Sequence, residues 1–228
     1  MTGAVAGASK KKDSAMAGKT AKKSSSRKTQ AERTAISDQL MFEAAIVLIN
    51  EHGTQKTTLK EIGERAGYSR GLANYRFGSK EGLLDELFTR FDTRWKQHVN
   101  SYVAGQSGIP AVRAAAKALR DFLKLESGYM RAMYMLWYES LGHNSVILNR
   151  LAGHHDVYRK DAAKWIRKGI EDGEIDPGIN PEQFAVQYCA FIFGTVYQWL
   201  VKAEALDLDA LFDDYDTNTI KLLSKGDR

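Results

Sequence analysis

Between residues 57 and 80 the sequence places helix-starting and helix-ending residues too close together for anything but short helices. Thr58 precedes the segment LKEIGERA, and Glu61 stands three residues later, which is the pattern of a capping box. Gly67 follows this segment, and Ser69 then precedes a second short segment, RGLANYRF, that also ends at a glycine. Two short helices with a tight glycine turn between them predict a helix-turn-helix, in which Gly67 takes the positive backbone φ of the turn.

The rest of the chain predicts further helices, and few stretches alternate as a strand would, so we expect an all-α fold. Asn180 and Pro181 form an N-cap followed by a proline in the first turn, which predicts the start of a long apolar helix. On the first helix we expect one buried face, made of Ile36, Leu40, Ala44, Val47 and Leu48. Besides the two short helices, the expected helices cover residues 29–52, 80–103, 111–126, 129–141, 155–170, 184–201 and 211–223.

Positive charge gathers at the N-terminal end of the chain. Residues 1–28 hold eight basic residues and one acidic residue, whereas the whole chain has a net charge of +5. This segment is rich in Ala, Gly, Ser and Lys, so we expect a disordered tail. A second basic excess lies between residues 56 and 80, and together the two favour a polyanionic partner. A tail that only aids solubility is the alternative interpretation.

The cysteine content and the apolar segments indicate the compartment. Cys189 is the only cysteine, so no intrachain disulfide forms, which fits a reducing cytosol. The first thirty residues contain no apolar run of a signal peptide, and we therefore expect a cytoplasmic protein. The apolar stretch 184–201 includes Gln187, Thr195 and Gln198, which favours a buried helix over a membrane span.

The segment TTLKEIGERAGYSRGLANYRFGSKEGLLDELF resembles the DNA-binding segment of the TetR (tetracycline-repressor-like) family. The resemblance covers about residues 33–90, and it is carried by the threonine pair, the Ala-Gly turn, and the Ser-Lys-Glu triplet. The chain has Ala73, Asn74 and Arg76 where members often have leucine, tyrosine and histidine. Further on, YRKDAAKWIRKGIEDGEIDPGINPE loosely resembles the branch of the choline-responsive betaine repressor.

The resemblance implies an all-α homodimer, in which three N-terminal helices bind DNA and a larger helical domain dimerises and holds a small-molecule effector. The usual activity is transcriptional repression that a ligand relieves. We expect a disordered basic tail at residues 1–28, a helix-turn-helix domain at 29–78, and an effector-binding and dimerisation domain at 79–228. The expected partners are a near-palindromic double-stranded DNA operator, an effector and a second copy of the chain, without a membrane.

The second short helix is the predicted recognition helix, which enters the major groove. The amide of Asn74 matches the donor and acceptor pattern of adenine, and Arg70 or Arg76 matches guanine. Alternatively, Arg76 and Tyr75 touch only phosphate, as we expect for Lys80. The candidate DNA-binding residues are Thr58, Ser69, Arg70, Gly71, Asn74, Tyr75, Arg76 and Lys80.

Aromatic residues are unusually dense in the C-terminal part of the chain. Stripes of this kind are most often core, but together they exceed what a small helical bundle needs. They favour a mostly apolar cavity for a hydrophobic or aromatic effector, with a cation held by ring faces as the alternative. The candidate effector-binding residues are Trp95, Tyr129, Met133, Tyr134, Trp137, Tyr138, Tyr188 and Phe191.

Helices at residues 155–172 and 181–202 are the predicted dimer interface, because small residues four apart leave a face that a partner helix can approach. Close packing within one chain is the alternative. The candidate interface residues are Tyr158, Trp165, Ala190, Gly194, Tyr197 and Val201.

Enzyme chemistry finds no support in the sequence. Cys189 is alone in an apolar helix, and no metal-ligand cluster, phosphate loop or nucleophile elbow is present, so we expect no enzyme, no metal and no cofactor. The remaining alternative to a ligand-responsive regulator is a ligand-independent or architectural DNA-binding protein that relies on its basic tail.

Overall fold

The computed structural model describes residues 29–142 and 146–224, and the predicted tail at residues 1–28 lies outside them. Every regular element of the described residues is helical, so the all-α prediction is confirmed. The helices are α1 Gln30–Lys56, α2 Leu59–Arg65, α3 Arg70–Phe77, α4 Lys80–Val103, α5 Gly108–Ser140, α6 Val146–Glu171, α7 Pro181–Val201 and α8 Leu208–Leu223, with a 3-10 turn at Ala203–Ala205.

The short helices begin and end where the sequence predicts. The hydroxyl of Thr58 accepts the N–H of Glu61 at 3.2 Å, and the Glu61 carboxylate accepts the N–H of Thr58 at 3.0 Å, which completes the capping box of α2. The Ser69 hydroxyl accepts the N–H of Leu72 at the start of α3. Gly67 has a φ of +79°. The segment α2–turn–α3 is therefore the predicted helix-turn-helix.

The buried face of α1 differs from the predicted face. Three of its five predicted residues, Ile36, Leu40 and Val47, are 38% or 39% exposed, and the other two are buried. The physical reason is that the side of α1 that meets the other helices lies further round its axis, through Met41, Ala45 and Leu48, and leaves the three exposed residues beside it. Besides the two correct residues, the core takes from this helix Met41, Phe42, Ala45 and Ile49.

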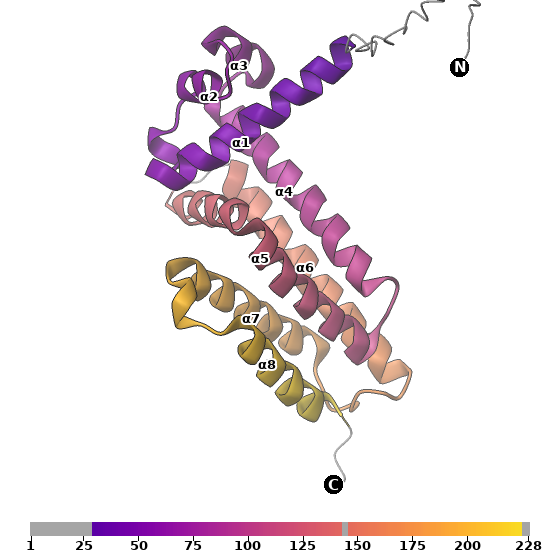
Figure 1. The fold of residues 1–228 in the computed structure, drawn as a ribbon. Helices are drawn as coiled ribbons and strands as arrows, with labels where there is room; N and C mark the ends of the chain where they lie inside the picture. Colours follow the sequence, from indigo (N-terminus) through magenta and orange to yellow (C-terminus); the bar gives the residue numbers. More distant parts are fainter. Residues whose placement is uncertain (1–28, 143–145, 225–228) are drawn as a thin grey trace, which may run out of the picture.

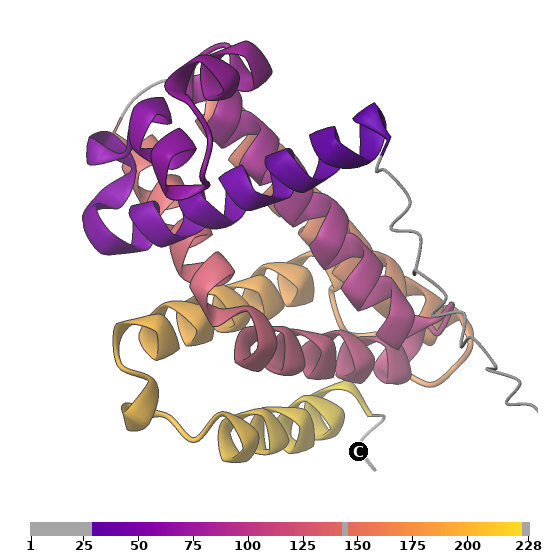
Figure 2. The same ribbon diagram turned by 45° about the horizontal axis from the view of Figure 1, so that its top comes forward.

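The three N-terminal helices form a head at one end of the molecule (Figure 1). The helix α4 leaves this head and runs along α5, which in turn packs on α6, α7 and α8 (Figures 1 and 2). Leu83 and Leu84, at the start of α4, are buried against the head, and Phe91 is buried further along the same helix. The helix α4 is therefore shared by the head and the bundle. The predicted boundary at residue 79 falls on its N-cap and stays a prediction.

The helices α5 and α6 depart most from their predicted bounds. The helix α5 runs on to Ser140 with a kink at Glu126, where φ is −124°, instead of breaking at Gly128. The helix α6 begins at Val146, well before the predicted start, because Arg150 is held by side chains of α4 instead of lying in a loop. A polar residue that forms its ion pairs with a helix distant in the sequence looks like a loop residue when only the local pattern is read.

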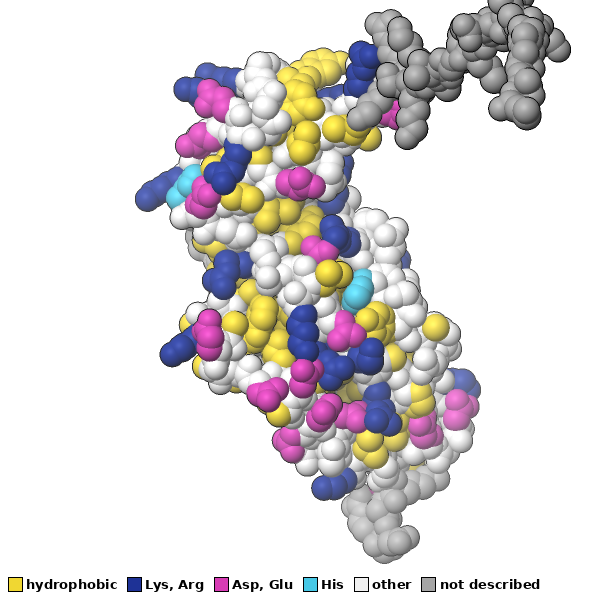
Figure 3. Space-filling view, viewed as in Figure 1, with side chains coloured by type: hydrophobic (Ala, Val, Ile, Leu, Met, Phe, Trp, Pro, Cys, Tyr) yellow, Lys and Arg dark blue, Asp and Glu magenta, His cyan; other side chains and the backbone are white. Residues whose placement is uncertain are grey.

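Ion pairs hold α8 against α5. Figure 3 shows basic and acidic side chains close together over this part of the surface. The ammonium of Lys124 lies 2.8 Å from the Asp209 carboxylate, and the guanidinium of Arg120 lies 3.4 Å from the same group. Exposed pairs of this kind contribute little each, so the buried Leu208 and Phe212 supply most of the packing of α8.

The helix α7 is long and apolar enough to cross a membrane by length and composition, with a mean hydropathy of 1.3. It packs along α6 within the bundle, and Phe184, Tyr188 and Val196 are among its buried residues. The Asn180 side chain accepts the N–H of Gln183 at 2.9 Å, which confirms the predicted N-cap. Packing within the bundle therefore accounts for one side of α7, while Val186, Tyr197 and Val201 on its other side stay exposed.

Candidate functional site

Four of the predicted DNA-binding residues form a stripe along the outer side of α3. Arg70 and Asn74 stand one helical turn apart, and so do Gly71 and Tyr75. All four are exposed, Tyr75 to 83%. Within the described residues, no hydrogen bond or ion pair engages the side chains of Arg70, Asn74 or Tyr75. Their polar groups are therefore free to bind a partner.

Gly71 leaves a low point on the surface of this stripe, although packing within the head does not require a glycine there. A Cβ added at Gly71 would come no closer than 3.7 Å to its nearest neighbour, the Ser69 hydroxyl. At Gly82, by contrast, an added Cβ would meet the Phe77 carbonyl oxygen at 2.3 Å, so packing alone requires that glycine. The absence of a side chain at Gly71 thus leaves the backbone of α3 open to close approach from outside.

The other four predicted DNA-binding residues hold the head together. Thr58 and Ser69 cap α2 and α3. The Arg76 guanidinium points to α1, 3.4 Å from the carboxylate of Asp38, and only 23% of its side chain is exposed. The Lys80 ammonium donates to the carbonyl oxygens of residues 54 and 55 at the end of α1. Arg76, predicted to read guanine or touch phosphate, and Lys80, predicted to touch phosphate, are thus both engaged within the protein.

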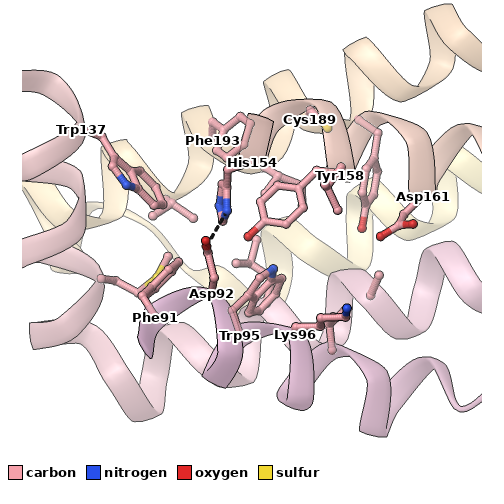
Figure 4. A pocket seen from close by; sticks show the side chains of 18 of the residues that line it. Phe91, Asp92, Trp95, Lys96, Trp137, His154, Tyr158, Asp161, Cys189 and Phe193 are labelled. Carbon is pink, nitrogen blue, oxygen red and sulfur yellow. Dashed lines mark ion pairs between the residues drawn. The ribbon is translucent and has the colours of Figure 1, made fainter. Parts of the chain in front are cut away.

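Behind the head, the helices α4, α5, α6 and α7 surround a cavity of about 490 Å³. This volume lies in the range of small-molecule sites, and the wall is mostly apolar and aromatic. Four of the eight predicted effector residues, Trp95, Tyr134, Trp137 and Tyr188, line it. Figure 4 shows how side chains from different helices meet around this space.

The other four predicted effector residues lie outside the wall of the cavity. The Tyr129 hydroxyl donates to a backbone carbonyl of α4 at 3.0 Å in the core, and Met133 is fully buried. Phe191 stacks on Tyr215 with ring centroids 3.6 Å apart, and Tyr138 is 51% exposed. These helices are apolar nearly all round. Their periodicity therefore does not show which side faces the cavity and which side faces the core or solvent.

Two of the predicted dimer residues face inward instead. Tyr158 and Trp165 line the cavity, because α6 turns this side towards α4 and α7. Burial raises the pKa of the Tyr158 hydroxyl well above its usual value. The other four lie on the open side of α7, where Tyr197 is 47% and Val201 66% exposed, Ala190 is exposed, and a Cβ at Gly194 would meet nothing within 4 Å.

The polar part of the cavity wall was missed by sequence reasoning. His154 Nδ1 lies 2.7 Å from Asp92 Oδ1 (Figure 4), and the Arg150 guanidinium lies 3.5 Å from the other oxygen of Asp92. Arg150, His154 and Asp161 recur on one face of α6, and this spacing could have found them had the helix been extended to residue 146. In the described parts of the chain, no group of three His, Cys, Asp or Glu side chains is placed to hold a metal ion.

The alkylation rate of Cys189 tests whether this part of the cavity wall is buried. It lines the cavity wall and is 6% exposed, and burial raises the pKa of its thiol to about 11. At about pH 8 the thiolate is therefore scarce, and we expect alkylation by iodoacetamide to be on the order of 100-fold slower than in the unfolded chain. The rate should rise about tenfold per pH unit below the pKa. Mass-spectrometric labelling in buffer and in guanidinium chloride measures this, and equal rates would contradict the burial of the thiol.

The fold and the site define a helix-turn-helix protein whose head is joined by one long helix to a hollow helical bundle. Residues 42–87 match the family model for "Bacterial regulatory proteins, tetR family". The HTH-type transcriptional regulator BetI of Yersinia pestis (strain Pestoides F) is 27% identical over 133 residues, which are 57% of this chain and 67% of that protein. BetI of Paraburkholderia phymatum is 26% identical over 103 residues, 44% of this chain and 53% of that protein.

Solved structures give the same result for the fold. The SmeT–triclosan complex has a TM-score of 0.68 and 22% identity, covering 84% of this chain and 93% of that chain. A second structure is that of NalD, the secondary repressor of the MexAB-OprM multidrug efflux pump in Pseudomonas aeruginosa. It has a TM-score of 0.68 and 18% identity, and the match covers 86% of this chain and 100% of that chain. The chain is thus similar to the transcriptional regulators of the TetR family, and to BetI among them, so the resemblance seen in the sequence is confirmed.

Proposed function

We propose that this protein is a transcriptional repressor that binds double-stranded DNA as a homodimer and leaves it when a small, largely hydrophobic effector fills the cavity. The observation that carries the proposal is that α4 begins against the head and also forms one wall of the cavity. The names of its relatives support it, because BetI is a transcriptional regulator, NalD is a repressor, and SmeT is seen with triclosan.

The helix α3 is the element that we place in the major groove. In its outer stripe, the amide of Asn74 can pair with adenine and the guanidinium of Arg70 with guanine. Tyr75, the most exposed of the four, is placed to reach the phosphate backbone. A helix of eight residues reads few base pairs, so two heads are needed for a specific site, and their symmetry makes that site near-palindromic.

The second copy of the chain is proposed to pack on the open side of α7. Tyr197 and Val201 expose apolar surface there, and Ala190 and Gly194 leave room for the backbone of a partner helix. Small side chains at this spacing allow helices to come close, while the larger ones at one end supply apolar contact.

The effector is proposed to act by moving α4. The Arg150 guanidinium of α6 donates to the Asp85 carboxylate at 2.6 Å and to the Thr89 hydroxyl at 2.9 Å, which ties α4 to α6 above the cavity. A molecule that wedges between these helices tilts α4, because packed helices move as rigid bodies between discrete arrangements. A tilt in each subunit shifts the two α3 helices away from the spacing of one DNA turn, roughly 34–36 Å.

Selection of DNA from a random pool by the purified protein tests the proposed function. We expect a near-palindromic site with two half-sites about one helical turn apart, bound by a dimer. Light scattering at micromolar concentration gives the oligomeric state. A pool without any preferred sequence, or a protein that stays monomeric, would contradict the proposal.

The architectural alternative is tested on the same site. A chain without residues 1–28 should keep its preference for the selected site and bind it more weakly, with a shallower salt dependence of about 0.9 per lost phosphate contact. Loss of nearly all DNA binding in this truncated chain would favour a protein that binds mainly through its tail.

A further inference from the structure

We infer that the effector carries a hydroxyl group on a lipophilic body, and that Tyr158 and Asp92 bind this hydroxyl. The inference rests on the proposed function in taking the cavity as the effector site. It adds the chemical class of the effector and the residues that recognise its polar group.

Tyr158 offers a hydroxyl that the protein itself does not use. Its ring is enclosed by Trp95, with centroids 6.3 Å apart, and by His154, with centroids 4.2 Å apart. Among the residues that the structure describes, none forms a hydrogen bond with the Tyr158 hydroxyl. Figure 4 shows this hydroxyl directed into the cavity towards Asp92. Tyr158 is partly buried and lines the cavity, so a molecule in the cavity is the group that can pair with its hydroxyl.

Asp92 supplies an acceptor at the same place. A carboxylate oxygen 2.7 Å from a bare ring nitrogen would be repelled, so His154 carries its proton on Nδ1, the atom that faces Asp92. His154 thereby holds the Asp92 carboxylate in position, while its own Nε2 is buried away from the cavity. This end of the cavity therefore combines a phenol donor with a carboxylate acceptor. A hydroxyl both donates and accepts, so it can bind Asp92 and Tyr158 together.

The charges of the wall argue against other polar groups. Asp92 and Asp161 both line the cavity and repel a carboxylate ligand. Of the two cations in the wall, Arg150 is already bound to Asp85 and Thr89, and the charge of Lys96 acts on Asp161, which offsets it. A quaternary ammonium cannot accept the proton of the Tyr158 hydroxyl. The rest of the wall includes Met130, Ile192, Phe193 and Val196, which suit an apolar body.

Three probes with the same biphenyl body distinguish a hydroxyl from an apolar group and from a carboxylate. We would titrate para-hydroxybiphenyl, para-methylbiphenyl and biphenyl-para-carboxylate into the full chain and measure binding by calorimetry. The hydroxyl probe should bind about tenfold more tightly than the methyl probe, which leaves Tyr158 and Asp92 unpaired, and the carboxylate should bind more weakly still.

Two variants assign the effect to residues. Tyr158→Phe keeps the ring and removes the hydroxyl, and should reduce the preference for hydroxyl over methyl to less than about threefold. Tyr215→Phe makes the same change on a ring outside the cavity wall and should leave that preference intact. Asp92→Asn should weaken binding of the hydroxyl probe and strengthen binding of the carboxylate probe. A general loss of packing would weaken binding of both. Circular dichroism shows whether each variant is folded. If Asp92→Asn is unfolded, the result for Tyr158→Phe alone tests the inference.

The inference is overturned if the methyl probe binds as tightly as the hydroxyl probe, if the carboxylate binds best, or if Tyr158→Phe keeps the full preference. It is also overturned if no probe binds the unaltered protein below about millimolar concentration, an affinity that a matching cavity of this size should exceed. None of these measurements involves DNA. Their failure would therefore leave the DNA-binding proposal standing, whereas a failed DNA selection would leave the chemistry of the cavity standing.

Discussion

Replacing Phe88 by alanine is expected to lower the free energy of unfolding by about 3–5 kcal/mol, as for other large aromatic residues removed from a core. Phe88 is fully buried where α4 meets the bundle. Its ring lies 5.6 Å from the ring of His154 and 6.0 Å from that of Trp137, and the Arg150 guanidinium stands 4.7 Å above it. The substitution leaves a void beside the residues that tie α4 to α6.

The matched control is Tyr75→Ala, which removes an aromatic ring that is 83% exposed and should change stability by no more than about 0.5 kcal/mol. Both variants should be unfolded in urea at the same protomer concentration, because dimerisation makes the apparent stability depend on concentration. A loss below about 1 kcal/mol for Phe88→Ala would show that this junction is not packed as described.

Substitution of Asn74 by alanine is expected to have the largest effect on DNA recognition. Each lost bidentate contact costs about 1–3 kcal/mol, and a symmetric dimer loses two of them, so operator binding should weaken by about 2–6 kcal/mol. The loss should be confined to one base pair in each half-site. Binding of the variant to the selected site and to each single-base change of it measures both quantities.

Asn218→Ala is the control for this substitution, because Asn218 is an exposed asparagine on α8 whose amide bonds Asp214 and lies outside the head. It should leave operator binding unchanged. A uniform loss over all sequences in Asn74→Ala would show that Asn74 contacts the DNA backbone and that Arg70 alone reads bases.

The head could be predicted from sequence because its signals are local. The capping box of Thr58, the cap at Ser69 and the positive φ of Gly67 each depend on residues within one turn. The roles of Arg76 and Lys80 could not be predicted in this way. Their partners lie on α1, far along the chain, and only the folded head turns these cations inward.

The cavity was harder to predict because its wall is a tertiary property. Tyr134 and Tyr138 stand one turn apart on α5, yet Tyr134 lines the cavity and Tyr138 is half exposed. The packing of α7 against α5 decides between them, and no local pattern contains that information. The role of His154 could not be predicted for the same reason, since its partner Asp92 belongs to α4.

The central claim is that filling the cavity weakens DNA binding. The most direct measurement is the Kd of the selected operator with and without saturating amounts of compounds that bind the free protein, found by thermal shift in a hydrophobic library. We expect at least one compound to weaken operator binding roughly 5- to 150-fold. The operator should weaken binding of that compound to the protein by the same factor. Compounds that occupy the cavity while the operator Kd stays unchanged would contradict the account and favour a regulator without a ligand switch.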